Sequence, residues 1–297
     1  MERLSIIIPV YNAEKFLGQL FHCLDKNQFN QGDEILLIDN GSADESKSLC
    51  LAQKEKNPQL YKYYYFDKKA GSYSARNFAL DMAEGDILVF TDSDCMPDSD
   101  WITNIRSNIK RGTVLAGEIE IEITQNGLWE NFDAIAHLDS ERNAAQNCVA
   151  TANMAVYKDD FFAVGKFEER FSGGDYEWSQ RARKKGKEIQ YLPQMHVLHP
   201  SRKSFSQILQ KEQRIAYGVG VHHRLHGGKR LPLLLVYILK VFKIDTNLRY
   251  SRQLRQRGFK GSALFKFNIC FFQIRKEQIK FVKAGFDRED VRKLAIK

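Results

Sequence analysis

GDILVFTDSD, at residues 85–94, is the stretch of sequence that decides the fold. Its four apolar residues 87–90 form a short continuous run, which is typical of a strand buried on both faces of a sheet. Asp92 and Asp94 follow with one residue between them, so the run ends in two carboxylates. Oxygen ligands of this kind suit Mg²⁺ or Mn²⁺. The segment therefore predicts a buried strand whose carboxyl end carries a metal site.

Further apolar runs and helical segments accompany this strand in the N-terminal part of the chain. The runs are short and continuous, while the segments between them place apolar residues at the three- and four-residue spacing of a helix. The predicted strands are residues 5–8, 34–38, 61–66 and 86–90, and the predicted helices are residues 13–24, 42–54 and 73–83. Such alternation predicts an α/β fold with a mainly parallel sheet that is flanked by helices on both faces.

Polar residues follow the first, second and fourth of these strands. They are Tyr11 and Asn12 after the first, residues 39–42 after the second, and residues 92–94 after the fourth. Ligands of parallel α/β sheets bind beyond the carboxyl ends of the strands. We therefore expect the three clusters to converge on one edge of the sheet and to form one site.

The sequence between residues 113 and 200 is more mixed. Residues 114–123 and 150–157 are predicted as strands, residues 175–186 as a helix that ends at a glycine, and residues 189–192 as a short strand closed by Pro193.

The composition is that of a globular protein from a reducing compartment. The chain has 297 residues, of which 43% are hydrophobic and six are prolines, and this argues against a disordered or fibrous protein. The five cysteines are scattered without CxxC spacing, so neither a disulfide framework nor a structural zinc site is expected. The apolar run at residues 4–10 lacks a small-residue cleavage site, which argues against a signal peptide. We therefore expect a cytoplasmic protein.

Charge is distributed very unevenly along the chain. Residues 1–201 hold 22 lysines and arginines against 31 acidic residues, a net charge of −9. Residues 202–297 hold 23 against six, a net charge of +17. A region this basic either binds a negatively charged partner, lipid or nucleic acid, or is a solvated helical face.

Two apolar segments lie within the basic region, at residues 231–242 and 263–272. Each contains a lysine, Lys240 or Lys266, and each is shorter than the roughly 20 residues that span a bilayer. A transmembrane span is therefore not expected. The segments are typical of interfacial helices, which would lie on the anionic inner face of the cell membrane. The alternative is that they pack on the rest of the chain or on a second copy in a homodimer.

Six motifs, taken in order, resemble those of family 2 inverting glycosyltransferases of the GT-A fold. They are LSIIIPVYN at 4–12, EILLIDNGSADES at 34–46, GSYSARN at 71–77, GDILVFTDSD at 85–94, SGGDYEWSQR at 172–181 and QYLPQMHVLHP at 190–200. The resemblance covers residues 3–220. It implies a GT-A domain at 1–220, with a Rossmann-like nucleotide-sugar-binding half at 1–112 and an acceptor half at 113–220. Residues 221–297 are then a basic, helical C-terminal extension.

The resemblance also assigns roles within the polar clusters. It implies a nucleotide-sugar pocket formed by Pro9, Tyr11, Asn12, Asp39, Arg76, Asn77, Asp92 and Ser93. It further implies a Mn²⁺ or Mg²⁺ site, with Asp94 as a direct ligand, Asp92 in contact with the ribose or the metal, and His199 completing the shell. Asn40 stands where many relatives have a second aspartate. Two alternatives remain, namely Asp39 as a helix cap and His199 as an ordinary loop histidine.

The acceptor base implied by the resemblance is Asp175, which matches the aspartate of a Glu-Asp motif. Gly174 replaces the glutamate of that motif, and Asp175 could instead be a helix N-cap. Glu177 is a second candidate for the base, although its spacing to Arg181 predicts a helical ion pair. The side chains expected to be structural are His196 and Trp178, although Trp178 could also stack on an acceptor sugar.

Together these residues predict a metal-dependent, inverting glycosyltransferase, as used in polysaccharide biosynthesis. The expected donor is a nucleotide-diphosphate sugar, a UDP-sugar first of all, and the expected acceptor is a hydroxyl of a glycan or a lipid-linked saccharide. One alternative is a nucleotidyltransferase, but the first strand is not followed by the glycine- and basic-rich phosphate loop expected of that class. The others are a catalytically silent relative that binds nucleotide sugars, and a protein that binds nucleic acid through aromatic residues of the basic region. Nucleic acid is the least expected partner.

Overall fold

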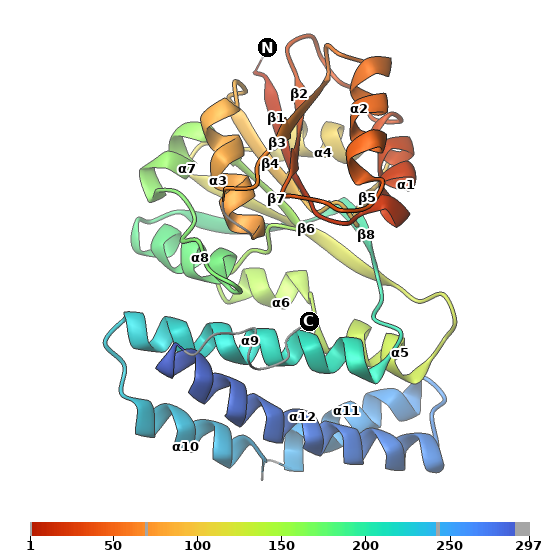
Figure 1. The fold of residues 1–297 in the computed structure, drawn as a ribbon, viewed down its shortest axis with the longest axis vertical. Helices are drawn as coiled ribbons and strands as arrows, with labels where there is room; N and C mark the ends of the chain where they lie inside the picture. The colour runs from red at the N-terminus through yellow and green to blue at the C-terminus, as the bar shows by residue number, and fades with distance from the viewer. Residues whose placement is uncertain (1, 69–70, 242–243, 289–297) are drawn as a thin grey trace. The chain divides into compact units, whose positions relative to one another are not determined.

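The computed structural model describes residues 2–68, 71–241 and 244–288. The chain forms two compact units (Figure 1). Unit 1 comprises Met1–Ile121, Leu138–Glu169 and Gly174–Pro200, and unit 2 comprises Glu122–His137, Arg170–Gly173 and Ser201–Lys297. Unit 1 is built on a sheet, and unit 2 is built on helices.

A single mixed sheet forms the centre of unit 1. Its strands are β1 (Leu4–Val10), β2 (Glu34–Asp39), β3 (Tyr61–Tyr65), β4 (Ile87–Thr91), β5 (Met96–Pro97), β6 (Thr113–Glu122), β7 (Asn153–Tyr157) and β8 (Glu188–Pro200). Their order is β3-β2-β1-β4-β7-β6-β8-β5. The pairs among β1, β2, β3 and β4 are parallel, whereas β7 runs antiparallel to β4 and β6, and β5 runs antiparallel to β8. The predicted α/β class is confirmed, and the parallel part of the sheet is its N-terminal half.

Helices cover both faces of this sheet, as the alternation predicted (Figure 1). They are α1 (Glu14–Leu24), α2 (Ser46–Lys56), α3 (Ser72–Met82), α4 (Trp101–Asn108), α6 (Ser140–Ala145), α7 (Lys158–Val164) and α8 (Gly174–Lys184). Side chains of β1 alternate between two cores, because successive residues of a strand face opposite sides. Ile6 and Ile8 pack in a core with residues of α1, while Ile7 packs in a second core with residues of α3. All three are fully buried, and Pro9 is the only residue of β1 that is not buried.

Strand β8 is much longer than predicted. The expectation that Pro193 closes this strand is wrong, because β8 continues to Pro200. Pro193 is exposed, and β5 pairs with β8 only at Val197 and Leu198. The proline therefore removes no ladder hydrogen bond to β5. The longer strand carries His199 to the same end of the unit as β5.

Unit 2 contains a bundle of helices within the described residues. They are α5 (Leu128–Ala136), α9 (Phe205–Leu225), α10 (Arg230–Val241), α11 (Ile244–Gln256) and α12 (Ser262–Asp287). Helices α9 and α12 pack so closely that both need a glycine where they meet. A Cβ on Gly220 would lie 2.1 Å from the Val282 carbonyl oxygen, and one on Gly285 would lie 2.1 Å from the Tyr217 carbonyl oxygen. The two missing side chains let the helix backbones touch.

A buried network of charged side chains connects α5, α9 and α12. His137 lies between two carboxylates, with Nδ1 2.6 Å from Asp133 Oδ1 and Nε2 2.8 Å from Glu212 Oε1. Asp133 also accepts a hydrogen bond from the Arg202 guanidinium at 3.1 Å, and Glu212 accepts one from Gln278 Nε2 at 2.6 Å. Burial alone would raise the pKa of Asp133, but the hydrogen bond from His137 and the neighbouring cations hold it well below its usual range.

The two apolar segments of the basic region are helical. Helix α10 covers the first as far as Val241, and α12 covers the second. Phe242, the last residue of the first segment, lies outside the described residues. In the part of the chain that the structure describes, no helix combines the length and the apolar character needed to cross a membrane.

Candidate functional site

Asn12 ties together the loops that follow β1 and β2. Its backbone N–H donates to Ser42 Oγ at 3.0 Å, and its Oδ1 accepts from the Ala43 N–H at 2.8 Å. Asn12 has a φ of 48°, in the left-handed region that asparagine adopts more readily than most residues. Tyr11 beside it is 63% exposed, and Pro9 is partly exposed near the end of β1. The first two polar clusters therefore meet at one edge of the sheet, with an aromatic ring open to a ligand.

Asp39 fixes the loop that follows β2. The side chain is fully buried, and its Oδ1 accepts from the Ser42 N–H at 2.8 Å while its Oδ2 accepts from the Tyr63 hydroxyl at 2.9 Å. The N-cap residue of α2 is Glu45, so Asp39 does not cap that helix. The contact of Asp39 with a nucleotide stays a prediction.

Asn40 uses both ends of its side-chain amide. Nδ2 donates to the Phe66 carbonyl oxygen at 2.7 Å, and Oδ1 accepts from the Gly71 N–H at 2.7 Å. An ionised aspartate could make only the second of these bonds, because it has no hydrogen to donate. This explains why an asparagine stands where the resemblance leads one to expect an aspartate.

Arg76 and Asp92 form an ion pair where β4 ends. The Arg76 side chain is 2% exposed and that of Asp92 is 33% exposed, so the pair is buried at the arginine and open at the carboxylate. Arg76 Nε is buried and has no hydrogen-bond partner among the described residues, and the guanidinium carbon lies 5.6 Å from the centre of the Tyr73 ring. A buried cation with an unused donor suits a site for a negatively charged ligand.

Asn77, the next residue, anchors the segment that precedes α8. Its Nδ2 donates to the Phe167 carbonyl oxygen at 2.8 Å, and its Oδ1 accepts from the Phe167 N–H at 3.1 Å. The two neighbours in the ARN motif therefore have different surroundings. Arg76 pairs with Asp92, while the amide of Asn77 is used within the scaffold.

Asp94 and His199 come together from distant parts of the sequence. His199 Nε2 lies 3.8 Å from Asp94 Oδ2, and His199 Nδ1 lies 2.8 Å from the Pro200 carbonyl oxygen. Because a carbonyl oxygen only accepts, Nδ1 is the donor in this hydrogen bond, and Nε2 is the ring nitrogen on the side of Asp94. A carboxylate oxygen and an imidazole nitrogen in this arrangement can share a divalent cation.

Asp92 adds a second carboxylate to this group. Ligand atoms of Asp92, Asp94 and Cys95 lie within 4.8 Å of one another, and Ser93 lies partly exposed between the two aspartates. Burial raises the pKa of the Cys95 thiol well above its usual value, so the thiol stays protonated. The two carboxylates, and not the sulfur, are therefore the groups that fit a hard cation such as Mn²⁺ or Mg²⁺.

Asp175 lies in the first turn of α8, where Tyr73 holds its side chain. The Tyr73 hydroxyl donates to Asp175 Oδ1 at 2.9 Å, and the same oxygen accepts from the Tyr176 N–H at 2.9 Å. Burial, together with the nearby carboxylate, raises the pKa of Tyr73 well above its usual value, so the phenol keeps the hydrogen that it donates. Since Tyr73 also lies beside Arg76, one chain of contacts connects Asp175 with the ion pair at β4.

Gly174 makes room for the same tyrosine. A Cβ on Gly174 would lie 2.9 Å from three atoms of the Tyr73 ring, a distance that real Cβ atoms essentially never show. A glutamate at this position would displace Tyr73. Gly174, which replaces the glutamate of the Glu-Asp motif, therefore leaves space for the Tyr73 ring. The sequence did not identify Tyr73 as a site residue. Its only signal in the sequence is an aromatic residue among the small and polar residues of GSYSARN.

Glu177 is buried and paired, as its spacing to Arg181 predicted. Its Oε1 accepts from Arg181 Nε at 2.7 Å, and its Oε2 accepts from Arg181 Nη2 at 3.0 Å. Arg181 also donates to the Val164 carbonyl oxygen at 2.8 Å, so the pair anchors α8 on the end of α7. A carboxylate bound at both oxygens is poorly placed to remove a proton from an acceptor, which favours Asp175 over Glu177 as the base.

Trp178 and His196 make the scaffold contacts that were expected of them. Trp178 is fully buried and stacks on Phe161, with the ring centres 5.0 Å apart. His196 lies between two carboxylates, with Nδ1 2.9 Å from Asp98 Oδ2 and Nε2 3.1 Å from Glu120 Oε2.

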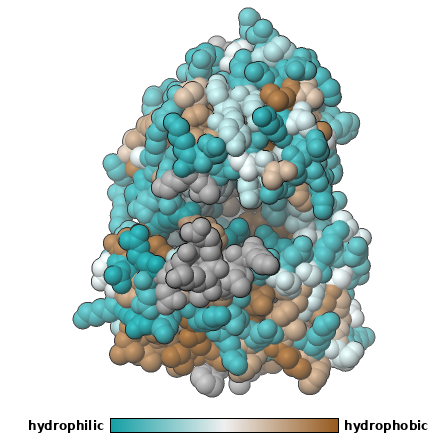
Figure 2. All heavy atoms as spheres, viewed as in Figure 1, coloured by the Kyte–Doolittle hydropathy of each residue, from teal (hydrophilic) through white to brown (hydrophobic). Residues whose placement is uncertain are grey.

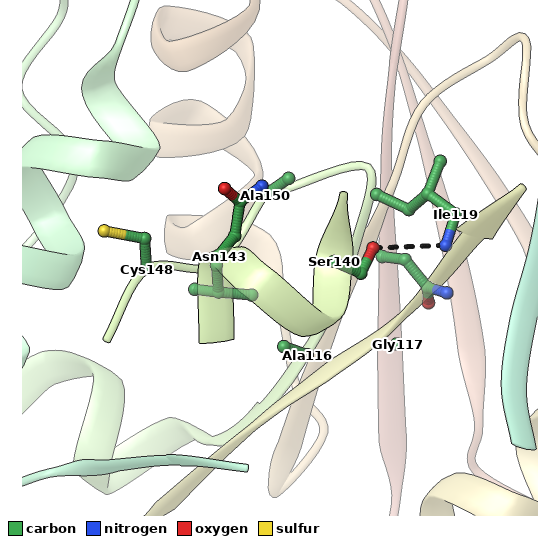
Figure 3. Close-up of a pocket in the computed structure, with 9 residues that line it drawn as sticks. Ala116, Gly117, Ile119, Ser140, Asn143, Cys148 and Ala150 are labelled. Atoms are coloured by element: carbon green, nitrogen blue, oxygen red, sulfur yellow. Dashed lines mark hydrogen bonds between the residues drawn. The ribbon is translucent and has the colours of Figure 1, made fainter. Parts of the chain in front are cut away.

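A small pocket lies beside β6 and α6 and is not a substrate site (Figure 3). Its volume is about 10 Å³, which leaves room for about one water molecule. The Ile119 N–H donates to Ser140 Oγ at 3.2 Å in its wall (Figure 3). The residues that line it are Ala116, Gly117, Ile119, Ser140, Asn143, Cys148, Val149, Ala150 and Asn153. A sugar ring does not fit there, so the open edge of the sheet remains the candidate site.

Two sequence comparisons relate this chain to glycosyltransferases. The family model for Glycosyl transferase family 2 matches residues 5–162 of this chain. Glycosyltransferase AglE of Haloferax volcanii is 30% identical over 264 residues, which are 86% of this chain and 86% of AglE.

Solved structures show the same fold. The mannosyltransferase PcManGT from Pyrobaculum calidifontis, in complex with GDP-Man and Mn²⁺, is similar with a TM-score of 0.67 at 14% identity, over 97% of this chain and 88% of that one. S. aureus TarS, in complex with UDP-GlcNAc, is similar with a TM-score of 0.53 at 17% identity, over 98% of this chain and 92% of that one. Both are glycosyltransferases of the GT-A fold. The family match and the relationship to AglE show that this chain belongs to glycosyltransferase family 2.

Proposed function

We propose that this chain is an inverting, metal-dependent hexosyltransferase that moves a sugar from a nucleotide-diphosphate sugar to an acceptor hydroxyl. The observation that carries the proposal is the arrangement at one edge of the sheet in unit 1. Three contacts make up this arrangement. Arg76 pairs with Asp92, His199 lies beside Asp94, and Tyr73 donates a hydrogen bond to Asp175. PcManGT and TarS, which have this fold, are complexed with GDP-Man and UDP-GlcNAc, and this supports a nucleotide-sugar donor, with UDP-sugars as the first to test.

The donor is held by the ends of β1, β2 and β4 in this proposal. Tyr11 offers an exposed ring for the base, and Asn12 and Asp39 shape the loop around it. Further contacts to the nucleotide sugar are assigned to Pro9, Arg76, Asp92 and Ser93. The unused Nε donor of Arg76 supplies positive charge close to where a diphosphate would lie.

A divalent cation, Mn²⁺ or Mg²⁺, fits the group formed by Asp94, Asp92 and His199. The carboxylates are hard ligands, and His199 has Nε2 on the side of Asp94 while Nδ1 is used by the Pro200 carbonyl oxygen. When bound, such a cation would stabilise negative charge on the diphosphate leaving group without any proton transfer. The Mn²⁺ in the PcManGT complex supports this assignment.

Asp175 serves as the base in this mechanism. It takes the proton of the acceptor hydroxyl while the acceptor oxygen bonds to the anomeric carbon and the bond from that carbon to the diphosphate oxygen breaks. Attack from the side opposite the leaving group inverts the anomeric centre. Tyr73 donates to Asp175 and keeps the carboxylate oriented. Glu177 is left to the scaffold, because Arg181 binds both of its oxygens.

The proposal extends to the organisation of the chain. The sequence places the end of the catalytic domain at residue 220, with the donor half at 1–112 and the acceptor half at 113–220, but residue 220 lies within α9 of unit 2. We therefore propose that the catalytic domain corresponds to unit 1, which ends at Pro200. Residues 221–297 form a basic helical extension, the acceptor is a saccharide or a lipid-linked saccharide, and the site of action is cytoplasmic.

A screen of nucleotide sugars by thermal shift, with and without Mn²⁺, tests the donor part of this proposal. The matching donor is expected to raise the melting temperature only when the metal is present, and Asp94→Asn is expected to remove that shift. Asp100→Asn is the matched control, because Asp100 is an exposed carboxylate at the N-cap of α4, outside the group of Asp92, Asp94 and His199.

Turnover is then followed by the release of the nucleoside diphosphate, and the anomeric configuration of the product is read by NMR. Donor binding without turnover for every acceptor would support a catalytically silent relative. A retained anomeric configuration would exclude Asp175 as the base of an inverting reaction.

A further inference from the structure

Helix α10 presents an apolar face that no described part of its own unit covers. Leu231, Leu235 and Leu239 are 68%, 48% and 61% exposed, and their spacing of four residues places them on one side of the helix. Val236 and Ile238 widen the same surface, at 51% and 40% exposed. An exposed surface of this size on a single helix is unusual for a monomeric soluble protein and marks an interaction site.

Helix α12 continues this pattern and adds charge to it. Phe265, Ile269 and Phe272 are 68%, 55% and 52% exposed and follow one another at four and three residues. Lys276, Lys280 and Lys283 continue at the same spacing and are all exposed. One side of α12 is therefore apolar in its first half and cationic in its second. Figure 2 shows apolar side chains gathered along the lower edge of the molecule, where Figure 1 draws α10 and α12.

The charge around these two helices has one sign. Among the described residues from 229 to 288, twelve lysines and arginines are exposed, against a single exposed acid, Asp245. A second copy of the chain placed symmetrically on this surface would bring cations against cations, because a twofold interface uses the same patch on both partners. The surface of α10 and α12 is instead complementary to a bilayer with anionic headgroups. Such a bilayer offers negative charge to the lysines and an apolar interior to the apolar side chains.

We infer that the surface formed by the exposed residues of α10 and α12 docks unit 2 on a membrane that contains anionic lipid. The leucines of α10 and the aromatic residues of α12 enter the headgroup region, and the lysines of α12 lie at the level of the lipid phosphates. The docked helices lie along the surface and do not cross it, in agreement with their length. This inference concerns the partner of unit 2 and does not depend on the donor chemistry of unit 1.

Co-sedimentation with vesicles tests the inference on the full chain. The vesicles are made of phosphatidylcholine alone or of phosphatidylcholine with phosphatidylglycerol, each at low and at high salt. Binding is expected to the anionic vesicles and to weaken as salt rises, because salt screens the lysines.

Two triple variants separate the apolar contribution from the electrostatic one. In the apolar variant, Leu235→Gln, Leu239→Gln and Phe265→Gln are combined, and its partition coefficient is expected to fall at least about tenfold. In the cationic variant, Lys276→Gln, Lys280→Gln and Lys283→Gln are combined. Its binding at low salt is expected to fall about a hundredfold, since each lysine near an anionic surface contributes about 1 kcal/mol.

Matched controls come from unit 1. Lys26→Gln, Lys47→Gln and Lys56→Gln remove three exposed lysines, and Phe162→Gln removes a phenylalanine that is 40% exposed. These controls are expected to bind vesicles like the unaltered chain, and all variants are expected to keep the thermal shift with the donor. Failure of donor binding alone would count against the proposed function and leave the docking surface standing.

Vesicle binding that is equal for the unaltered chain and both triple variants would overturn the inference, as would no binding by the unaltered chain. Size-exclusion chromatography with light scattering measures the oligomeric state of the unaltered chain and of the apolar variant. If the apolar variant turns a dimer into a monomer while vesicle binding is unchanged, the surface is an interface between copies and the inference is wrong.

Discussion

Two groups of acidic side chains, one in each unit, are placed in opposite ways. At the edge of the sheet in unit 1, the side chains of Asp92 and Asp94 are each 33% exposed. In unit 2, the side chain of Asp133 is 0% exposed and is held by His137 and Arg202. A carboxylate that is open on one side can take a ligand, whereas one that is enclosed by partners mainly stabilises its fold. This difference agrees with the proposal that places the chemistry in unit 1, and it gives Asp133 a structural role in unit 2.

Loss of the Asp94 carboxylate is expected to have the largest effect. Asp94→Asn removes the proposed metal ligand, which should lower kcat with Mn²⁺ by at least about a thousandfold while the melting temperature hardly changes. Initial rates of nucleoside diphosphate release measure this effect, and Asp100→Asn serves as the control. Full activity of Asp94→Asn in the presence of EDTA would show that the edge of the sheet holds no essential cation.

Asp133→Asn is the counterpart in unit 2. It leaves buried cations without their partner and is expected to lower the free energy of unfolding by about 3 kcal/mol, measured by urea denaturation at pH 7. Activity per folded molecule should hardly change. Asp245→Asn, at an exposed acid of the same unit, is the control. If Asp133→Asn lowers activity instead of stability, the structural role given to Asp133 is wrong.

The same variant has a predicted pH dependence. The pKa of Asp133 is lowered in the folded chain, so its stabilising contribution is complete above the unfolded pKa of about 4 and is lost as the pH falls below that. The free energy of unfolding of Asp133→Asn should therefore fall less steeply below pH 4 than that of the unaltered chain. Parallel curves for the two proteins would contradict the network described for unit 2.

Asp175 and Glu177 offer a sharper comparison within one helix of unit 1. Asp175→Asn is expected to lower kcat by at least about a hundredfold with little change in donor affinity. Glu177→Gln should instead lower stability, because it weakens a bidentate pair with Arg181. Steady-state kinetics with both variants, corrected for the folded fraction, decide between them. A larger loss of kcat in Glu177→Gln would place the base two residues later.

The smallest predicted effect concerns Tyr73. Tyr73→Phe keeps the ring but removes the hydrogen bond to Asp175, and kcat is expected to fall about tenfold with the KM for the donor unchanged. Gly174→Ala should be more damaging, because its Cβ would meet the Tyr73 ring. An unchanged kcat in Tyr73→Phe would show that Asp175 is oriented by its own helix.

Much of unit 1 could be predicted from the sequence, because its first strands are buried on both faces. Continuous apolar runs marked β1, β2 and β4, and the polar residues after them marked the edge where the site lies. The pair of Glu177 with Arg181 was also predictable, since it follows from a spacing of four residues. Local patterns were sufficient in these cases.

Contacts between distant segments could not be predicted in the same way. Tyr73 and Asp175 are 102 residues apart, and nothing in either motif points to the other. The antiparallel pairing of β7 with β4 is also a contact between distant segments, because β5, α4, β6, α5 and α6 lie between these strands in the sequence. In unit 2 the net charge was visible, but the burial of Asp133 was not, because an isolated aspartate normally indicates a surface position.

The position of His199 late in the sequence has a consequence for folding during synthesis on the ribosome. Asp94 leaves the ribosome 105 residues ahead of His199, and β4 gains its second neighbour only when residues 153–157 have been made. Asp92 and Asp94 are therefore synthesised before the rest of the sheet and before His199 can lie beside them. A nascent chain that stops before residue 199 has the motif without the histidine. The proposed cation site is thus completed late in synthesis, and products truncated before residue 199 lack its histidine.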